Sequence, residues 1–92
     1  MLTEDVKTAL RISHTKLDDD ISKKIESAKA EMVRLGVSLS KANDESDPLI
    51  SEAIITYVRR DYEEDPVKNE MFTKSWESQV DGLRKSTGYA DV

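Results

Sequence analysis

Apolar residues recur at helical spacing along most of the chain. Between residues 16 and 35 they follow one another at steps of three or four, which places them on one helix face: Leu17, Ile21, Ile25, Ala28, Met32 and Leu35. At about 1.5 Å per residue this helix is roughly 30 Å long. Gly36 follows where a left-handed cap residue is expected. The pattern predicts one long helix, about residues 16–35, as the backbone of the domain.

Three shorter apolar patterns predict further helices. The first begins with Thr3 as its cap and ends near Ile12, because the next three residues are polar. The Asp-Pro pairs at 47–48 and 65–66 each join a preferred cap residue to a preferred first helical residue, so they mark two more starts. The last helix places four apolar side chains at steps of four, four and three: Phe72, Trp76, Val80 and Leu83.

The remaining segments are predicted to be irregular. Residues 37–46 are rich in Ser, Asn and Asp, which is typical of a loop. Gly88 is a plausible stop for the last helix, and residues 89–92 are expected to form a flexible tail. The sequence therefore predicts an all-α fold, a small bundle of about four helices in a single domain that spans residues 1–88.

Composition limits the classes of function. The chain has 92 residues and few aromatics, so its core is modest and leaves room for stabilisation by partners or self-assembly. Without cysteine it can form neither a disulfide nor a thiolate metal site. No apolar run approaches the roughly 20 residues that span a bilayer, and the N-terminus does not resemble a signal peptide, so no membrane contact is expected.

Negative charge is concentrated in the middle of the chain. The net charge is −5, and residues 44–65 alone carry eight acidic and two basic side chains. Proteins that grip DNA obtain much of their affinity by neutralising phosphates with basic side chains. The chain is therefore a poor candidate for binding DNA tightly, although it could lie close to DNA without binding it.

The stretch KLDDDISKK, residues 16–24, invites a metal-binding interpretation. Three consecutive aspartates on a helix point about 100° apart and do not converge on one ion. A helix start explains them better. Thr15 and Asp18 have capping-box spacing, and the helix dipole stabilises acidic side chains in the first turn. Two acid-before-base pairs at four-residue spacing are also expected, Asp19 with Lys23 and Asp20 with Lys24.

No catalytic constellation can be recognised. His14 is the only histidine and lies in a polar connector, where a solvated side chain is the simpler interpretation. The three glycines are never clustered as a phosphate-binding loop requires. A pair of carboxylates could act in hydrolysis only on the wall of a deep cleft, which is rare in so small a helical domain. We therefore predict a protein that is not an enzyme and has no catalytic residue, cofactor or metal.

Two features allow a structural and a binding interpretation. Arg59 and Arg60 could pair with acids on their own helix, or one of them could bridge to an acidic patch on a neighbouring subunit. Trp76 has the spacing of a core residue, but tryptophan is also enriched at the centres of interfaces.

The pattern of the whole chain resembles that of a known family. Its elements are L-x-x-x-V-K-x-x-L-R-I at 2–12, D-x-x-I-x-x-x-I-x-x-A at 18–28, and A-I-x-x-Y-V-x-x-x-Y-E at 53–63. The run QVDGLR at 79–84 looks like a looser form of the Gln-Leu-Arg ending found in members of that family. Together these elements resemble the small head-tail connector proteins of tailed bacteriophages, also described as DNA-packaging or head-completion proteins.

The resemblance implies an assembly function. Members form a ring of identical subunits that joins the portal protein to the next neck or tail-completion protein, and the genome passes along the ring axis. It implies a location in the neck of the virion, and in the cytoplasm of the bacterial host during assembly or as a prophage product. Acidic side chains facing the channel would let DNA pass without specific binding.

The resemblance leads to two sets of candidate site residues. The candidate subunit or partner contacts are Arg59, Arg60, Phe72, Trp76, Leu83 and Arg84. The candidate channel-facing acids are Asp44, Glu45, Asp61, Glu63, Glu64 and Asp65.

A small helical regulator remains the alternative, binding a partner protein or binding DNA through a helix-turn-helix. Against DNA reading, the basic residues are scattered, and no predicted helix offers a basic face free of acids.

Overall fold

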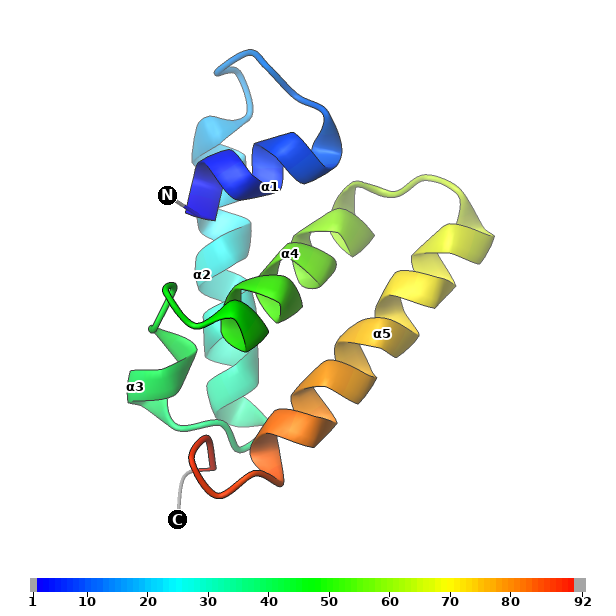
Figure 1. Cartoon of the computed structure of the whole chain (residues 1–92). Helices are drawn as coiled ribbons and strands as arrows, with labels where there is room; N and C mark the ends of the chain where they lie inside the picture. Colours follow the sequence, from blue (N-terminus) through cyan, green and yellow to red (C-terminus); the bar gives the residue numbers. More distant parts are fainter. Residues whose placement is uncertain (1, 91–92) are drawn as a thin grey trace.

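Five helices make up the fold in a computed structural model that describes residues 2–90. They are α1 (Leu2–Leu10), α2 (Asp18–Arg34), α3 (Leu39–Ala42), α4 (Pro48–Tyr62) and α5 (Pro66–Arg84). Four of them are longer than two turns, which confirms the predicted all-α bundle. In Figure 1, α4 and α5 form an antiparallel hairpin, α2 crosses behind α4, and α1 lies over the first part of α2.

The core lies around α4, which packs against α1, α2 and α5. Ile50, Ile54 and Val58 of α4 are fully buried. The predicted stripe of α2 supplies the opposite wall, since Ile21, Ile25, Ala28 and Met32 are all buried. The interior thus consists mostly of aliphatic side chains that the helical period had placed on inward faces.

The two Asp-Pro helix starts are confirmed. The carboxylate of Asp47 accepts a hydrogen bond from the N–H of Leu49, and that of Asp65 accepts one from the N–H of Val67, both at 2.9 Å. Each carboxylate satisfies a helix N–H that has no partner within the helix.

The two predicted threonine caps are wrong. Thr3 lies inside α1, which already includes Leu2. Helix α2 has Leu17 at its N-cap and no side-chain cap, because Thr15 lies two residues further back and offers only its backbone carbonyl, to the N–H of Asp18. The sequence spacing was compatible with a capping box, but no side chain makes a cap hydrogen bond at the start of α2.

The predicted loop at residues 37–46 contains a short helix, α3, so that prediction was wrong for Leu39–Ala42. Ser38 caps this single turn by accepting a hydrogen bond from the N–H of Lys41, and Ala42 is fully buried. One helical turn is too short to show an apolar period, so its stability comes from the cap and from packing against α2.

The tail prediction is wrong for Tyr89 and Ala90, which are docked on the domain. The N–H of Ser38 donates to the carbonyl of Tyr89 at 2.7 Å, and Val37 and Ala90 form an isolated antiparallel bridge. The helix before them ends at Arg84 rather than at Gly88. Residues 91 and 92 of the predicted tail lie outside the described residues.

Two helices end in Schellman motifs, one with glycine and one with arginine at the left-handed position. At the end of α2, Gly36 has φ of +112° and the N–H of Val37 bonds to the carbonyl of Met32. At the end of α1, Arg11 occupies the left-handed position, with φ of +59°. The N–H of Ile12 donates a hydrogen bond to the carbonyl of Lys7. The predicted cap role of Gly36 is confirmed.

Substitutions at these two positions should change stability in opposite directions. Arg11→Gly is expected to raise the free energy of unfolding by about 0.5–1 kcal/mol, because glycine adopts positive φ without steric cost. Gly36→Ala is expected to lower it by about 1–2 kcal/mol for the same reason. Urea denaturation followed by circular dichroism measures both. Equal signs for the two changes would contradict the assigned backbone conformations.

Candidate functional site

Two of the three aspartates at the start of α2, Asp18 and Asp20, connect that helix to others. Asp18 Oδ1 lies 3.0 Å from the ammonium of Lys7 on α1, and Asp20 accepts a hydrogen bond from the hydroxyl of Tyr62 on α4. Burial of the Tyr62 hydroxyl, together with this hydrogen bond to Asp20, raises the pKa of Tyr62. Among residues 2–90, no three acidic or histidine side chains gather as metal ligands would. The cluster stabilises the packing of α1 and α4 against α2.

The two expected pairs along α2 are wrong. Lys24 reaches across to Asp61 of α4, at 3.5 Å, and its ammonium lies over the ring of Tyr62. Asp20 also faces α4, while Asp19 and Lys23 have no ion pair within the described chain. Contacts between helices therefore replaced the local pairing that the four-residue spacing allowed.

A second polar contact fixes the C-terminal segment. The hydroxyl of Tyr89 donates to Asp47 Oδ2 at 2.6 Å, and the ammonium of Lys41 lies over the Tyr89 ring, 5.0 Å from its centre. The hydrogen bond lowers the pKa of the Asp47 carboxyl and raises that of the Tyr89 phenol. The carboxylate thus caps α4 with one oxygen and binds Tyr89 with the other.

The Asp47–Tyr89 contact predicts a stability difference that depends on pH. A lowered carboxyl pKa stabilises the fold above about pH 4, and this contribution is lost as the pH falls through the folded-state pKa. A raised phenol pKa stabilises the fold below about pH 10, and this contribution is lost as the pH rises through the folded-state pKa.

Comparison with Tyr89→Phe isolates this contact, because the other titrating groups are common to both proteins. The wild type should melt at a higher temperature by a constant amount from about pH 5 to pH 9, and the difference should shrink beyond each limit. Thermal denaturation across pH measures it. A difference that does not change with pH would contradict the assigned hydrogen bond.

Two of the candidate contact residues belong to the core. Trp76 is 3% exposed and Leu83 is 5% exposed. The Trp76 ring packs edge-on against Tyr57, with ring centres 4.8 Å apart and an interplanar angle of 63°. Both side chains pack in the core, as the helical spacing predicted, and Leu83 also lines the edge of a groove between α4 and α5. The prediction of Trp76 as a contact is therefore wrong for the isolated subunit, whereas that of Leu83 stays a prediction.

The other candidate contacts lie at or near the surface. Arg59 is exposed, with its guanidinium over the half-buried Phe72 ring at 4.7 Å. Arg60 pairs with Asp61 at 3.2 Å and stacks on Tyr57. Arg84 donates to Asp81 at 2.8 Å, one turn earlier on the same helix. Among these three arginines, only Arg59 has no ion pair in the described chain.

The candidate channel-facing acids fall into two groups. Asp44 and Glu45 precede α4, whereas the other four surround its end: Asp61, Glu63, Glu64 and Asp65. The length of α4 separates the groups by roughly 20 Å. Glu45 binds the ammonium of Lys29. Burial lowers the pKa of Lys29, but hydrogen bonds and charge attraction from Glu45 and Glu26 outweigh it, so that this pKa is raised. Asp61 is also paired, so the exposed negative charge is less than the sequence count suggested.

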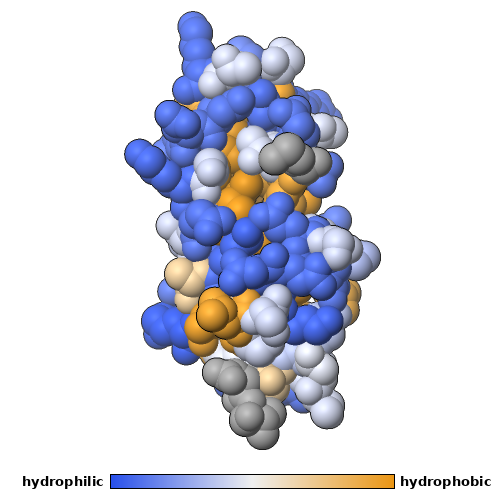
Figure 2. Space-filling view, turned by 90° about the vertical axis from the view of Figure 1, so that its left-hand side faces the viewer, coloured by the Kyte–Doolittle hydropathy of each residue, from blue (hydrophilic) through white to orange (hydrophobic). Residues whose placement is uncertain are grey.

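Hydrophobic side chains are few on the face that carries α3 and part of α2. Figure 2 shows this face as largely hydrophilic, with hydrophobic side chains in a recess of its upper half and in a patch of its lower half. The large apolar side chains that are strongly exposed are Leu39, Leu49, Val67 and Met71. Two of them line grooves on the α4–α5 hairpin.

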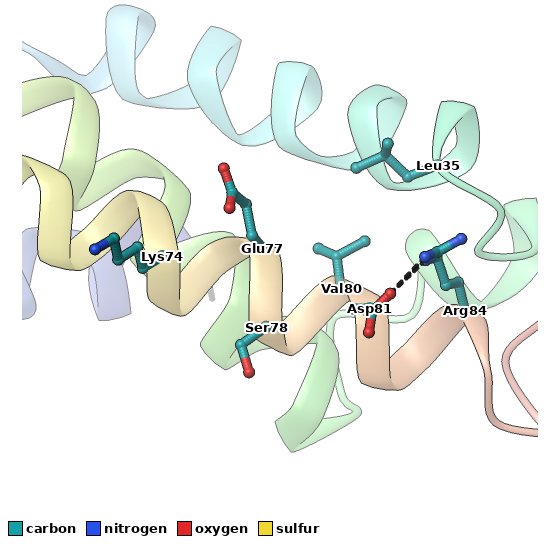
Figure 3. A pocket seen from close by; sticks show the side chains of 7 residues that line it. All are labelled: Leu35, Lys74, Glu77, Ser78, Val80, Asp81 and Arg84. Carbon is teal, nitrogen blue, oxygen red and sulfur yellow. Dashed lines mark hydrogen bonds and ion pairs between the residues drawn. The ribbon is translucent and has the colours of Figure 1, made fainter.

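A groove of about 600 Å³ lies between the end of α2 and α5. Figure 3 shows Leu35 of α2 above Val80 of α5, with Asp81 bonded to Arg84 beside them. The charged groups along this groove are spread over three turns of α5 and do not converge on a point. The groove therefore has no arrangement suited to catalysis or to a small ligand.

Two smaller grooves of about 320 Å³ lie at opposite ends of the hairpin. The Met71 groove, where α4 ends and α5 begins, is lined by Arg59, Glu63, Lys68, Met71 and Phe72. The Leu49 groove, where α4 begins and α5 ends, is lined by Leu49, Glu52, Ser78, Gln79, Gly82, Leu83 and Ser86. The sequence candidates include Arg59, Phe72, Glu63 and Leu83 of these grooves but not Lys68 or Glu52. Their only sequence signal was a charge next to an apolar residue.

Comparison with known proteins decides the family. The sequence model of the phage connector protein family matches residues 1–86, which include all five helices. The chain belongs to the phage connector protein family. Neither a curated protein nor a solved structure matched the chain.

Membership in the phage connector family assigns the chain a structural role in bacteriophage, between head and tail. Such a role agrees with a small helical domain whose polar clusters join helices. Within residues 2–90, no helix is both long enough and apolar enough to cross a membrane.

Proposed function

We propose that this protein is a head-tail connector subunit, identical copies of which form a ring between the portal protein and the next neck or tail-completion protein. The observation that carries the proposal is the family match over residues 1–86. On this proposal the protein resides in the neck of the virion, and in the cytoplasm of the bacterial host during assembly or as a prophage product.

The surface charge supports passage of DNA without specific binding. The net charge is −5, and several exposed acids have no ion pair within the described chain, among them Glu64 and Asp65. Acidic side chains that face a channel repel the phosphate backbone, whereas a basic lining would hold it. The subunit then contributes a wall along which DNA moves during packaging and ejection.

Assembly on the portal tests the proposal. The purified chain is mixed with the portal protein of the same phage, and the mixture is analysed by size-exclusion chromatography with light scattering and by negative-stain electron microscopy. The expected result is a complex in which several copies form a ring on one face of the portal. A chain that does not bind the portal, but dimerises and binds duplex DNA at moderate salt, would contradict the proposal. That result would favour the alternative of a small helical regulator.

A further inference from the structure

The Met71 groove combines exposed apolar surface with two cations that have no ion pair in the described chain. Met71 is 62% exposed, and Val67 beside it at the start of α5 is also exposed. Neither Arg59 nor Lys68 has an ion pair within residues 2–90, and Glu63 is the single acid of the groove. The groove therefore carries net positive charge on a protein whose net charge is −5.

The Leu49 groove has the complementary character. Leu49 is 58% exposed, and no basic residue lines the groove. The carboxylate of Glu52 has no cation partner in the described chain, and Gln79 Oε1 is shielded from water without a hydrogen-bond donor. This groove thus offers apolar surface beside acceptors that lack donors.

The two grooves cannot meet within one chain, because they lie at opposite ends of the hairpin, roughly 20 Å apart along α4. They can meet between two copies. A contact between two different surfaces of identical subunits is heterologous, and its repetition closes a ring when the rotation between neighbours allows it.

From this complementarity we infer that the Met71 groove of one copy receives the Leu49 edge of the next copy. Leu49 packs against Met71 and Phe72, and Arg59 and Lys68 face Glu52. The inference rests on the proposed function, since it names the surfaces through which the ring forms. A second copy is the occupant because each groove exposes an apolar side chain, and the charge that each groove lacks is present on the other groove of the same chain.

Disulfide cross-linking tests the contact without background, because the chain contains no cysteine. In the variant Leu49→Cys with Met71→Cys, each copy carries one thiol on each proposed surface. Mild oxidation at raised protein concentration, with and without portal protein, is expected to yield a series of linked oligomers on a non-reducing gel. Each single-cysteine variant can give dimers at most.

The matched control replaces Leu49 by a site outside both grooves, as Ser27→Cys with Met71→Cys. Ser27 lies on the exposed face of α2. This pair measures linkage by random collision and is expected to give far fewer linked oligomers. Linkage of the Leu49–Met71 pair that does not exceed that of the control would overturn the inference.

A charge exchange in the same cysteine background tests the polar part of the contact. Lys68→Glu and Glu52→Lys, each alone, should raise the concentration needed for half-maximal linkage by roughly tenfold, because each places like charges face to face. The two changes together in one chain should restore linkage, because the pair is re-formed with reversed polarity. A double variant that is worse than either single variant would contradict the assigned pairing.

The portal arm distinguishes failure of this inference from failure of the proposed function. A ring on the portal without Leu49–Met71 linkage refutes the contact and leaves the connector role. Linkage in solution without any portal complex supports the contact and counts against the connector role.

Discussion

Replacing Trp76 by alanine should lower the free energy of unfolding by about 3–5 kcal/mol. The side chain is almost completely buried and packs edge-on against Tyr57, so its removal leaves a cavity between α4 and α5 and an aromatic ring without its partner. A chain of this length has a total free energy of unfolding of about 5–14 kcal/mol, so the variant should be marginally folded. Urea denaturation measures the change.

Circular dichroism is the suitable signal, because Trp76 is the only tryptophan and its fluorescence is lost in the variant. Met71→Ala is the matched control on the same helix. Met71 is mostly exposed, so its truncation should change the free energy of unfolding by less than about 0.5 kcal/mol. If both variants have similar stability, Trp76 is not part of the core. The prediction that Trp76 is a contact residue would then be supported again.

Replacing Asp18 by alanine should cost about 1–3 kcal/mol, more than its place on a helix surface suggests. The Lys7 side chain is only 7% exposed and lies 3.0 Å from Asp18 Oδ1. Removal of the carboxylate leaves a shielded ammonium without a counter-charge, while the partial exposure of Asp18 lets water replace some of the lost interaction. Thermal and urea denaturation at neutral pH measure the loss.

Asp19→Ala is the control for Asp18, because both residues lie in the first turn of α2 and interact alike with the helix dipole. Asp19 is exposed and has no ion pair in the described chain, so its loss should cost less than about 0.5 kcal/mol. A melting temperature that rises with added Ca²⁺ or Mg²⁺, and no longer does so in the Asp18 variant, would show that the triplet is a metal site after all.

Helices with a local physical signal could be predicted from the sequence. The Asp-Pro pairs combine a side-chain acceptor with a fixed φ, and they begin α4 and α5 where expected. The stripe of α2 spans several turns, and Gly36 ends it in a conformation that other residues rarely adopt. These features depend on neighbours in sequence, so no tertiary information was needed.

The errors arose where tertiary contacts replaced local ones. The helix α3 and the docking of Tyr89 depend on groups far apart in the chain, such as the Asp47 carboxylate that binds the Tyr89 hydroxyl. Asp20 and Lys24 could pair with each other on α2 but bind Tyr62 and Asp61 of α4 instead. Helical spacing identifies the partners that a side chain can reach on its own helix. It does not identify partners on a different helix.

The candidate site was predictable only in part for the same reason. Arg59 and Phe72 were recognised, and the structure places them together in the Met71 groove. The Leu49 groove is lined by both Glu52 of α4 and Gln79 of α5, which belong to no common sequence motif. Trp76 showed two compatible interpretations in the sequence, and only its burial between α4 and α5 decided between them.

The most direct test of the connector role is loss of the protein from the phage that encodes it. Infected cells should then accumulate DNA-filled heads and free tails that do not join, and supply of the intact chain from a plasmid should restore complete particles. Electron microscopy of the lysate, together with plaque counts, measures both. A phage that lacks the protein and still yields complete, infectious particles in normal number would contradict the account.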